Sequence, residues 1–169
     1  MGHNRQHVMK QYSIFLLFVL AIACQPKNKA LDKKDDPQLS KLKLPSGFRV
    51  SFYAQDVGNA RSLALGDRGT VFVGNRKGKN VYALADADND GVAEKKYTVA
   101  SGMNTPNGVA FHDGALYIAE IDKIWKIDNI ESNLEHPGKP VLVNDSFPSK
   151  EHHGWKYIAF GPDGKLYVP

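Results

Sequence analysis

Short apolar or alternating stretches follow one another from residue 44 to the last residue, and Gly, Asp, Asn and Pro separate them. No stretch keeps a helical period for three turns, whereas alternation with a period of two between turn residues is typical of β-strands. The hydrophobic pattern therefore predicts an all-β domain over residues 44–169.

Three of these stretches are versions of one another, and each combines a small apolar strand, an Asp/Gly turn and a second strand that carries an aromatic residue. They are residues 61–75, 107–121 and 156–169. Leu63, Val109 and Ile158 hold the same place in the three copies, at intervals of roughly 45–50 residues, which is the period of a four-stranded β-propeller blade. We therefore predict a β-propeller rather than a β-sandwich, which would not repeat one pattern at so constant an interval.

The turn residues favour a β-hairpin inside each copy. Asp67-Arg68-Gly69, Asp113-Gly114 and Asp163-Gly164 put Asp or Gly where a hairpin needs positive φ. The first strand of each copy is small and apolar on both faces, so we expect it to be fully buried. A third strand is expected to follow, beginning near Asn80 in the first copy and near Lys123 in the second.

The number of copies indicates an incomplete propeller. Residues 44–169 hold two to three blades, whereas propellers usually close with about four to eight. We therefore expect this sequence to be the N-terminal fragment of a longer protein.

Residues 1–23 have the pattern of a signal peptide. Arg5, His7 and Lys10 give a positive start, and residues 12–23 are apolar apart from Ser13 but too short for a permanent membrane span. The only cysteine, Cys24, ends this run behind small residues, as in a lipoprotein signal. We predict lipidation of Cys24 and attachment to the cell envelope, in a Gram-negative cell at the outer membrane. The alternative is an ordinary secretory peptide with an incidental cysteine.

Residues 24–43 are predicted to be the lipidated cysteine and a polar, flexible tether. The formal net charge is +4, and removal of Arg5 and Lys10 with the signal lowers it to about +2. This balance gives no reason to expect a nucleic-acid partner, and the lipid is the only membrane contact that we predict.

Polar and aromatic residues precede the first strand of each copy, where a propeller opens its central channel. Arg61, Asn107 and Lys156 stand two places before the matched apolar residues, and Asn104 and Trp155 lie just upstream. We expect these five residues to line a pocket at the channel mouth.

Two further groups could carry chemistry. His152 and His153 precede the third copy, and a histidine at a channel mouth can accept a hydroxyl proton, although a solvated loop would have the same sequence. Asp86, Asp88 and Asp90 alternate before Gly91 and could bind a structural calcium weakly, but Tyr97 replaces the last ligand of an EF-hand.

The stretches LPSGFRVSFYAQDVGNARSLALGDRGTVFVGN, SGMNTPNGVAFHDGALYIAEI and HHGWKYIAFGPDGKLYVP resemble the start of the PQQ-dependent sorbosone dehydrogenase and soluble aldose sugar dehydrogenase family. The resemblance implies a six-bladed propeller that holds pyrroloquinoline quinone (PQQ) and calcium over its channel. It also implies oxidation of a sugar or aldehyde by hydride transfer to the quinone, with an electron acceptor that the sequence does not identify. The general base of the family falls on His153, with His152 as the runner-up. Arg61, Asn104, Asn107, Trp155 and Lys156 are then candidate cofactor-binding residues.

This chain also departs from that family. Lys156-Tyr157 stand where glucose dehydrogenases have Gly-Arg, and the calcium ligands, the quinone-binding cations and the acidic partner of the histidine are expected beyond residue 169. We therefore expect these 169 residues alone to be inactive. Two alternatives stay open: a gluconolactonase-like calcium-dependent hydrolase, with Asn104, Asn107 and Glu120 as possible ligands, and a non-catalytic propeller that binds glycans or proteins.

Overall fold

The computed structural model describes residues 37–169, and in this part regular structure consists of β-strands and two short 3-10 helices. The predicted signal peptide, Cys24 and most of the predicted tether lie outside the described residues. None of the helices in the described part is long and apolar enough to cross a membrane.

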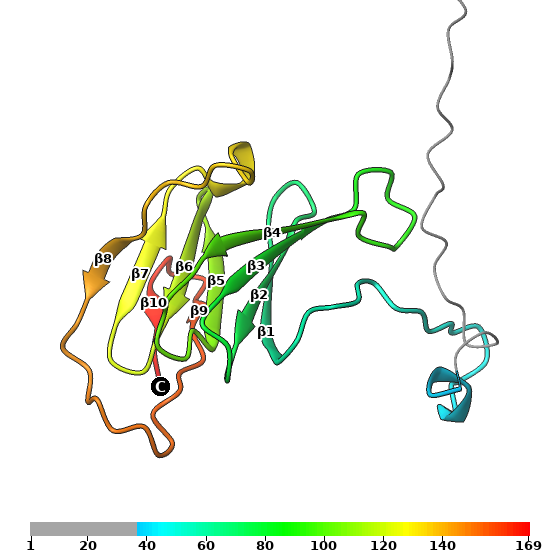
Figure 1. Ribbon diagram of the computed structural model, residues 1–169, viewed down its shortest axis with the longest axis horizontal. Coiled ribbons are helices and arrows are strands. Elements are labelled where there is room, and N and C mark those ends of the chain that lie inside the picture. The colour runs from blue at the N-terminus through cyan, green and yellow to red at the C-terminus, as the bar shows by residue number, and fades with distance from the viewer. Residues whose placement is uncertain (1–36) are drawn as a thin grey trace, which may run out of the picture.

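Ten strands form two four-stranded antiparallel sheets and one hairpin (Figure 1). The first sheet contains β1 (Ala60–Leu65), β2 (Val71–Asn75), β3 (Val81–Ala85) and β4 (Lys95–Ala100). The second contains β5 (Gly108–His112), β6 (Ala115–Ala119), β7 (Ile124–Ile127) and β8 (Val141–Asn144), and the hairpin pairs β9 (Ala159–Phe160) with β10 (Leu166–Tyr167). The 3-10 helices are η1 (Leu39–Lys41) and η2 (Ile130–Ser132).

Every sheet follows chain order, so each strand pairs with the next one in the sequence. The predicted all-β class is confirmed, and the Asp/Gly turns lie where they were expected, with positive φ at Gly69, Gly114 and Gly164. The expected third strands are present as β3 and β7. The sequence pattern had not marked the fourth strands, β4 and β8, individually.

The sheets pack face to face through a core that both supply. The first sheet contributes Phe72 and the second contributes Leu116 and Ile118, and all three side chains are fully buried. Phe72 stacks on Phe111 of β5 with ring centroids 5.7 Å apart and ring planes inclined by 9°. A second, smaller core joins the second sheet to the hairpin through Ile158.

The first strands of the two sheets and of the hairpin are neighbours: β5 contacts β1 on one side and β9 on the other. Such an order places the sheets as a propeller-like fold would, with the first strand of each sheet on the inside. The expectation that every first strand is fully buried is wrong for β1, whose Leu63 and Leu65 are 66% and 68% exposed. It is also wrong for β9, in which Ala159 is exposed and Phe160 is half-buried. Within residues 37–169 the second sheet covers only one face of the first sheet, so these two leucines stay open to solvent.

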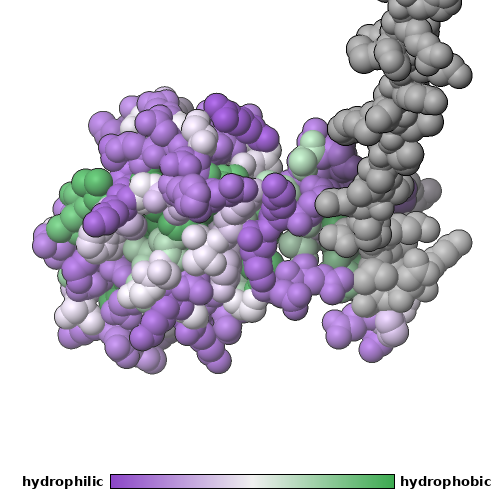
Figure 2. All heavy atoms as spheres, turned by 45° about the horizontal axis from the view of Figure 1, so that its top comes forward, coloured by the Kyte–Doolittle hydropathy of each residue, from purple (hydrophilic) through white to green (hydrophobic). Residues whose placement is uncertain are grey.

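A second apolar surface lies on the outer edge of the second sheet. Val141, Leu142 and Val143 of β8 are all exposed. Figure 2 shows apolar surface at the left end of the molecule, the end at which Figure 1 places β8.

Glu131 of η2 connects the two sheets at the end away from the histidines. Its carboxylate accepts hydrogen bonds from the backbone N–H groups of Arg68, at 3.1 Å, and Thr70, at 3.4 Å, in the β1–β2 turn. A Cβ on Gly66 would meet this carboxylate, so a larger residue there would displace the Glu131 side chain.

We expect Glu131→Ala to lower the free energy of unfolding by roughly 1–2 kcal/mol, because it leaves these N–H groups without their charged acceptor. Urea denaturation followed by circular dichroism measures the change, and Glu135→Ala, at an exposed position on the same connection, is the control. Equal stability of the two variants would show that Glu131 does not hold the sheets together.

Candidate functional site

The segments before the first strands gather at one end of the sheets. The backbone N–H of Asn75, at the end of β2, donates to the carbonyl of Pro106 at 2.8 Å. The amide Nδ2 of Asn107 then donates to the carbonyl of Lys156 at 2.9 Å. These bonds connect the segment before β5 to the first sheet on one side and to the segment before β9 on the other. We call this end of the molecule the loop end.

Asn107 is the centre of these connections and is fully buried. The hydroxyl of Ser62 donates to its carbonyl oxygen, and the N–H of Val109 donates to the same hydroxyl at 3.1 Å. Its side-chain Oδ1 has no hydrogen-bond partner among the described residues. In this structure the Asn107 side chain holds the loops together, and its cofactor role stays a prediction.

The two histidines lie exposed on the segment that leads to β9. Their ring centroids are 4.2 Å apart, and His153 lies 5.4 Å from the ring of Trp155. His153 has a φ of 57°, a backbone conformation that non-glycine residues adopt rarely and that is enriched at functional sites.

This segment borders an open hollow of about 420 Å³. Both histidines and the side chains of Lys150 and Lys156 line it, and no carboxylate side chain does. Its remaining lining residues are Phe147, Pro148, Gly154, Val168 and Pro169. The lining therefore offers imidazole and ammonium groups to a ligand.

Lys156 is 7% exposed, and the protein itself uses its ammonium group. The Nζ atom donates to the carbonyl of Gly154 at 3.1 Å and lies 5.2 Å from the ring centroid of Phe147. The hydrogen bond from Lys123 lowers the pKa of Asp122 below its usual value, and the nearby charge of Lys156 makes a smaller contribution in the same direction.

Arg76 reaches this segment from the first sheet. Its guanidinium carbon lies 3.8 Å from the ring centroid of Trp155, so the cation stacks on the indole face. Arg76 is a site residue that the repeat pattern does not reveal, because it follows β2 and belongs to none of the segments before the first strands. Only its distance from Trp155 in the folded chain reveals the contact.

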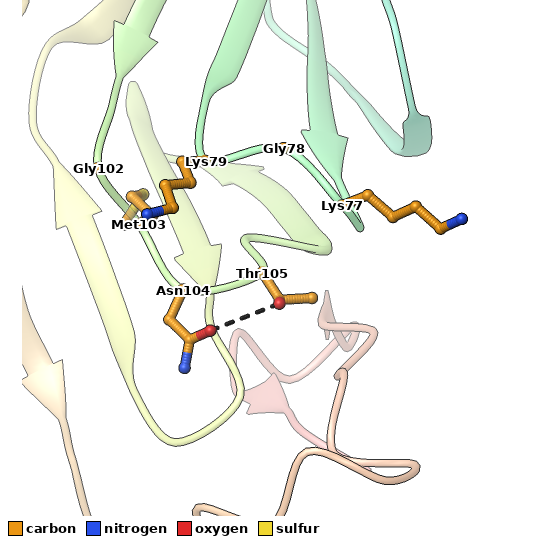
Figure 3. A pocket seen from close by; sticks show the side chains of 7 residues that line it. All are labelled: Lys77, Gly78, Lys79, Gly102, Met103, Asn104 and Thr105. Atoms are coloured by element: carbon orange, nitrogen blue, oxygen red, sulfur yellow. Dashed lines mark hydrogen bonds between the residues drawn. The ribbon is translucent and has the colours of Figure 1, made fainter.

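A second hollow, of about 280 Å³, lies between the β2–β3 turn and the connection from β4 to β5. Figure 3 shows the side chain of Lys79 extending toward Met103, and that of Lys77 pointing away on the other side of the turn. Thr105 Oγ1 donates to Asn104 Oδ1 at 3.5 Å (Figure 3). Asn104, one of the predicted cofactor-binding residues, thus lies on this hollow rather than on the one beside the histidines.

Glu120 supports the wall of the second hollow. This buried carboxylate accepts the backbone N–H of Asn104 and, at 2.8 Å, the indole N–H of Trp125. Both of its oxygens therefore have donors within the protein. The gluconolactonase-like alternative needs the Glu120 carboxylate free to bind a metal ion, so these two hydrogen bonds count against it.

Arg61 lies on β1 with its side chain exposed. Its guanidinium forms no hydrogen bond or ion pair with another residue in the described range. The structure therefore brings Asn107, Trp155, Lys156 and the histidines together at the loop end, and Arg61 forms no hydrogen bond or ion pair with them.

The three aspartates of the predicted calcium loop lie between β3 and β4, on a turn that projects from the sheets in Figure 1. Asp86, Asp88 and Asp90 are joined by Glu94, and each offers one carboxylate oxygen within 4.8 Å of the others. Burial, followed by the negative charges of Asp86 and Glu94, raises the pKa of the adjacent Tyr53 above its usual value.

One protein family matches the whole of the described part of the chain. The model of the family described as "Domain of unknown function (DUF7133)" matches residues 34–169. This chain belongs to the DUF7133 family. The DUF7133 domain therefore includes both sheets, the hairpin and the loop end.

Individual relatives of this DUF7133 chain are more distant. An uncharacterized protein of Borreliella burgdorferi is 27% identical over 122 residues, which are 72% of this chain and 28% of that protein. A protein from Thermus thermophilus, named as a glucose dehydrogenase, has a TM-score of 0.47 at 22% identity over 64% of this chain and 36% of its own. The PQQ-bound aldose sugar dehydrogenase of Streptomyces coelicolor has a TM-score of 0.49 at 21% identity over 69% and 39%. The chain thus spans well under half of each of these three proteins.

Proposed function

We propose that this chain is the N-terminal part of a PQQ-dependent sugar or aldehyde dehydrogenase, built on a β-propeller and attached to the cell envelope through lipid on Cys24. The observation that carries the proposal is the segment from His152 to Lys156, which borders the hollow of about 420 Å³ at the loop end. The resemblance of this segment to the sorbosone and aldose dehydrogenases adds the type of reaction.

His153 is the proposed general base. A neutral imidazole can accept the proton of a sugar hydroxyl near neutral pH, and the exposed ring at the edge of the hollow is open to a substrate. His152 touches its ring and is the alternative base. Trp155, on the other side of His153, limits the positions that the imidazole can adopt.

The residues present fit a planar, polyanionic quinone. The hollow is lined by ammonium and imidazole groups without a carboxylate side chain, and the indole of Trp155 adds an aromatic face beside it. Lys150 would meet a carboxylate of the cofactor. Trp155 lies beside the hollow rather than on it, with the Arg76 guanidinium stacked on its indole, so its contact with the ring system would be at the edge of the site. When bound, PQQ would accept the hydride from the sugar carbon.

Calcium does not fit this hollow, because no carboxylate side chain lines it and Ca²⁺ takes oxygen ligands. Calcium ligands at the channel would therefore have to come from beyond residue 169, as the resemblance implies. We assign calcium instead, as a weak structural ion, to the loop with Asp86, Asp88, Asp90 and Glu94.

We expect millimolar calcium to raise the melting temperature of the protein and Asp88→Asn to reduce that increase, because the variant removes one charged oxygen ligand. Differential scanning calorimetry with calcium or with EDTA measures the effect. Asp67→Asn, in the β1–β2 turn, is the matched control. An equal calcium response in the two variants would rule out this loop as the ion site.

Turnover tests the function as a whole. The full-length protein, reconstituted with PQQ, is expected to reduce an artificial electron-accepting dye when an aldose is added. A protein that binds sugar but never reduces the dye would favour the non-catalytic propeller.

A further inference from the structure

Arg76 carries an unpaired positive charge at the loop end. Its guanidinium face is occupied by the indole of Trp155, at 3.8 Å from the ring centroid. Within residues 37–169 its side chain donates no hydrogen bond and forms no ion pair. A stacked guanidinium still presents its N–H groups in the plane of the cation, and this edge matches the two oxygens of a carboxylate.

The surroundings of Arg76 favour an anion. The next residues of the β2–β3 turn are Lys77, Gly78 and Lys79, and neither lysine has an acidic partner in the described part of the chain. Both line the second hollow, whose other residues include Asn104 and Thr105 but no carboxylate side chain. Three cations in four residues would repel one another, and a bound anion removes that repulsion.

Arg76 lines neither hollow, but residues that adjoin it line both. It precedes Lys77, which borders one hollow, and it contacts Trp155, which is flanked by Gly154 and Lys156 of the other. A ligand bound to Arg76 through a negative group would therefore lie beside Trp155, whose ring is 5.4 Å from that of His153.

We propose that Arg76 binds a carboxylate of the substrate and that the substrate is a sugar acid rather than a neutral sugar. The substrate class rests on the proposed function, whereas the carboxylate site does not depend on turnover. Lys77 and Lys79 add positive potential around the site. The stack on Trp155 fixes the guanidinium, so that little conformational entropy is lost when the carboxylate binds.

Calorimetric titration of the full-length protein tests the site with three probes: D-glucuronate, its neutral amide D-glucuronamide, and D-glucose. We expect glucuronate to bind roughly ten- to a hundredfold more tightly than the amide, the range for charge-assisted hydrogen bonds. Arg76→Gln should remove this preference. Arg76→Lys should keep only part of it, because lysine has a charge but no bidentate edge. The control Arg68→Gln, in the exposed β1–β2 turn, should keep all of it.

Equal binding of glucuronate and glucuronamide, or binding of neither, would overturn the proposal. If circular dichroism shows that Arg76→Gln does not fold, the Lys77→Gln/Lys79→Gln double variant must weaken glucuronate binding selectively. An unchanged preference for glucuronate in that variant would also overturn the proposal.

Titration with PQQ separates the sources of the carboxylate: loss of PQQ affinity in Arg76→Gln with an intact glucuronate preference would assign Arg76 to the cofactor instead. A glucuronate preference without any dye reduction would support the carboxylate site and contradict the dehydrogenase.

Discussion

Replacing His153 with alanine is expected to lower sugar-dependent dye reduction by the full-length protein roughly 100- to 10,000-fold, the usual contribution of a general base. The physical reason is that, apart from His152, no other imidazole or carboxylate side chain lines the hollow, whose remaining ionisable side chains are the ammonium groups of Lys150 and Lys156. The measurement is the initial rate of dye reduction at saturating PQQ.

Two further variants decide which imidazole acts. We expect His152→Ala to reduce the rate by a smaller factor than His153→Ala, and His136→Ala, an exposed histidine before β8, to leave it unchanged. A full rate in His153→Ala combined with a large loss in His152→Ala would move the base by one residue. Full rates in both would remove the segment from the chemistry.

Phe72→Ala is expected to have the largest effect on stability, at roughly 3–5 kcal/mol, because the variant opens a cavity where the two sheets meet. Phe72 is fully buried and stacks on Phe111 of the neighbouring sheet, so both sheets lose contacts. Chemical denaturation followed by circular dichroism gives the change in free energy.

Phe48→Ala is the matched control for this experiment. The side chain of Phe48 is 70% exposed, so its removal should change the free energy of unfolding by less than about 0.5 kcal/mol. If Phe72→Ala and Phe48→Ala lowered stability equally, the face-to-face packing of the sheets would not be the main source of cohesion.

The sequence predicted the features of the fold that local chemistry determines. Positive φ at Gly69, Gly114 and Gly164 follows from the Asp/Gly turns, and the interval between copies predicted two four-stranded sheets and the start of a third. The exposure of Leu63 and Leu65 was not predictable, because burial depends on a neighbouring sheet and not on the strand's own residues.

The candidate site was predicted only in part, for a related reason. The repeat placed Asn107, Trp155 and Lys156 at one end of the sheets, and the structure brings them together there. The repeat could not show that Asn107 and Lys156 use their side-chain donors to hold loops. It also could not show that Arg76 stacks on Trp155. Most of these contacts join residues that are far apart in the chain, and no local pattern encodes them.

The absorbance spectrum of the full-length protein loaded with PQQ tests the central proposal most directly, because it needs no dye and reports the cofactor itself. On addition of an aldose or a sugar acid, we expect the spectrum of the oxidised quinone to be replaced by that of the reduced form, with the change lost in His153→Ala. A spectrum that stays oxidised with every sugar, in a protein shown to hold both the quinone and the sugar, would contradict the dehydrogenase proposal.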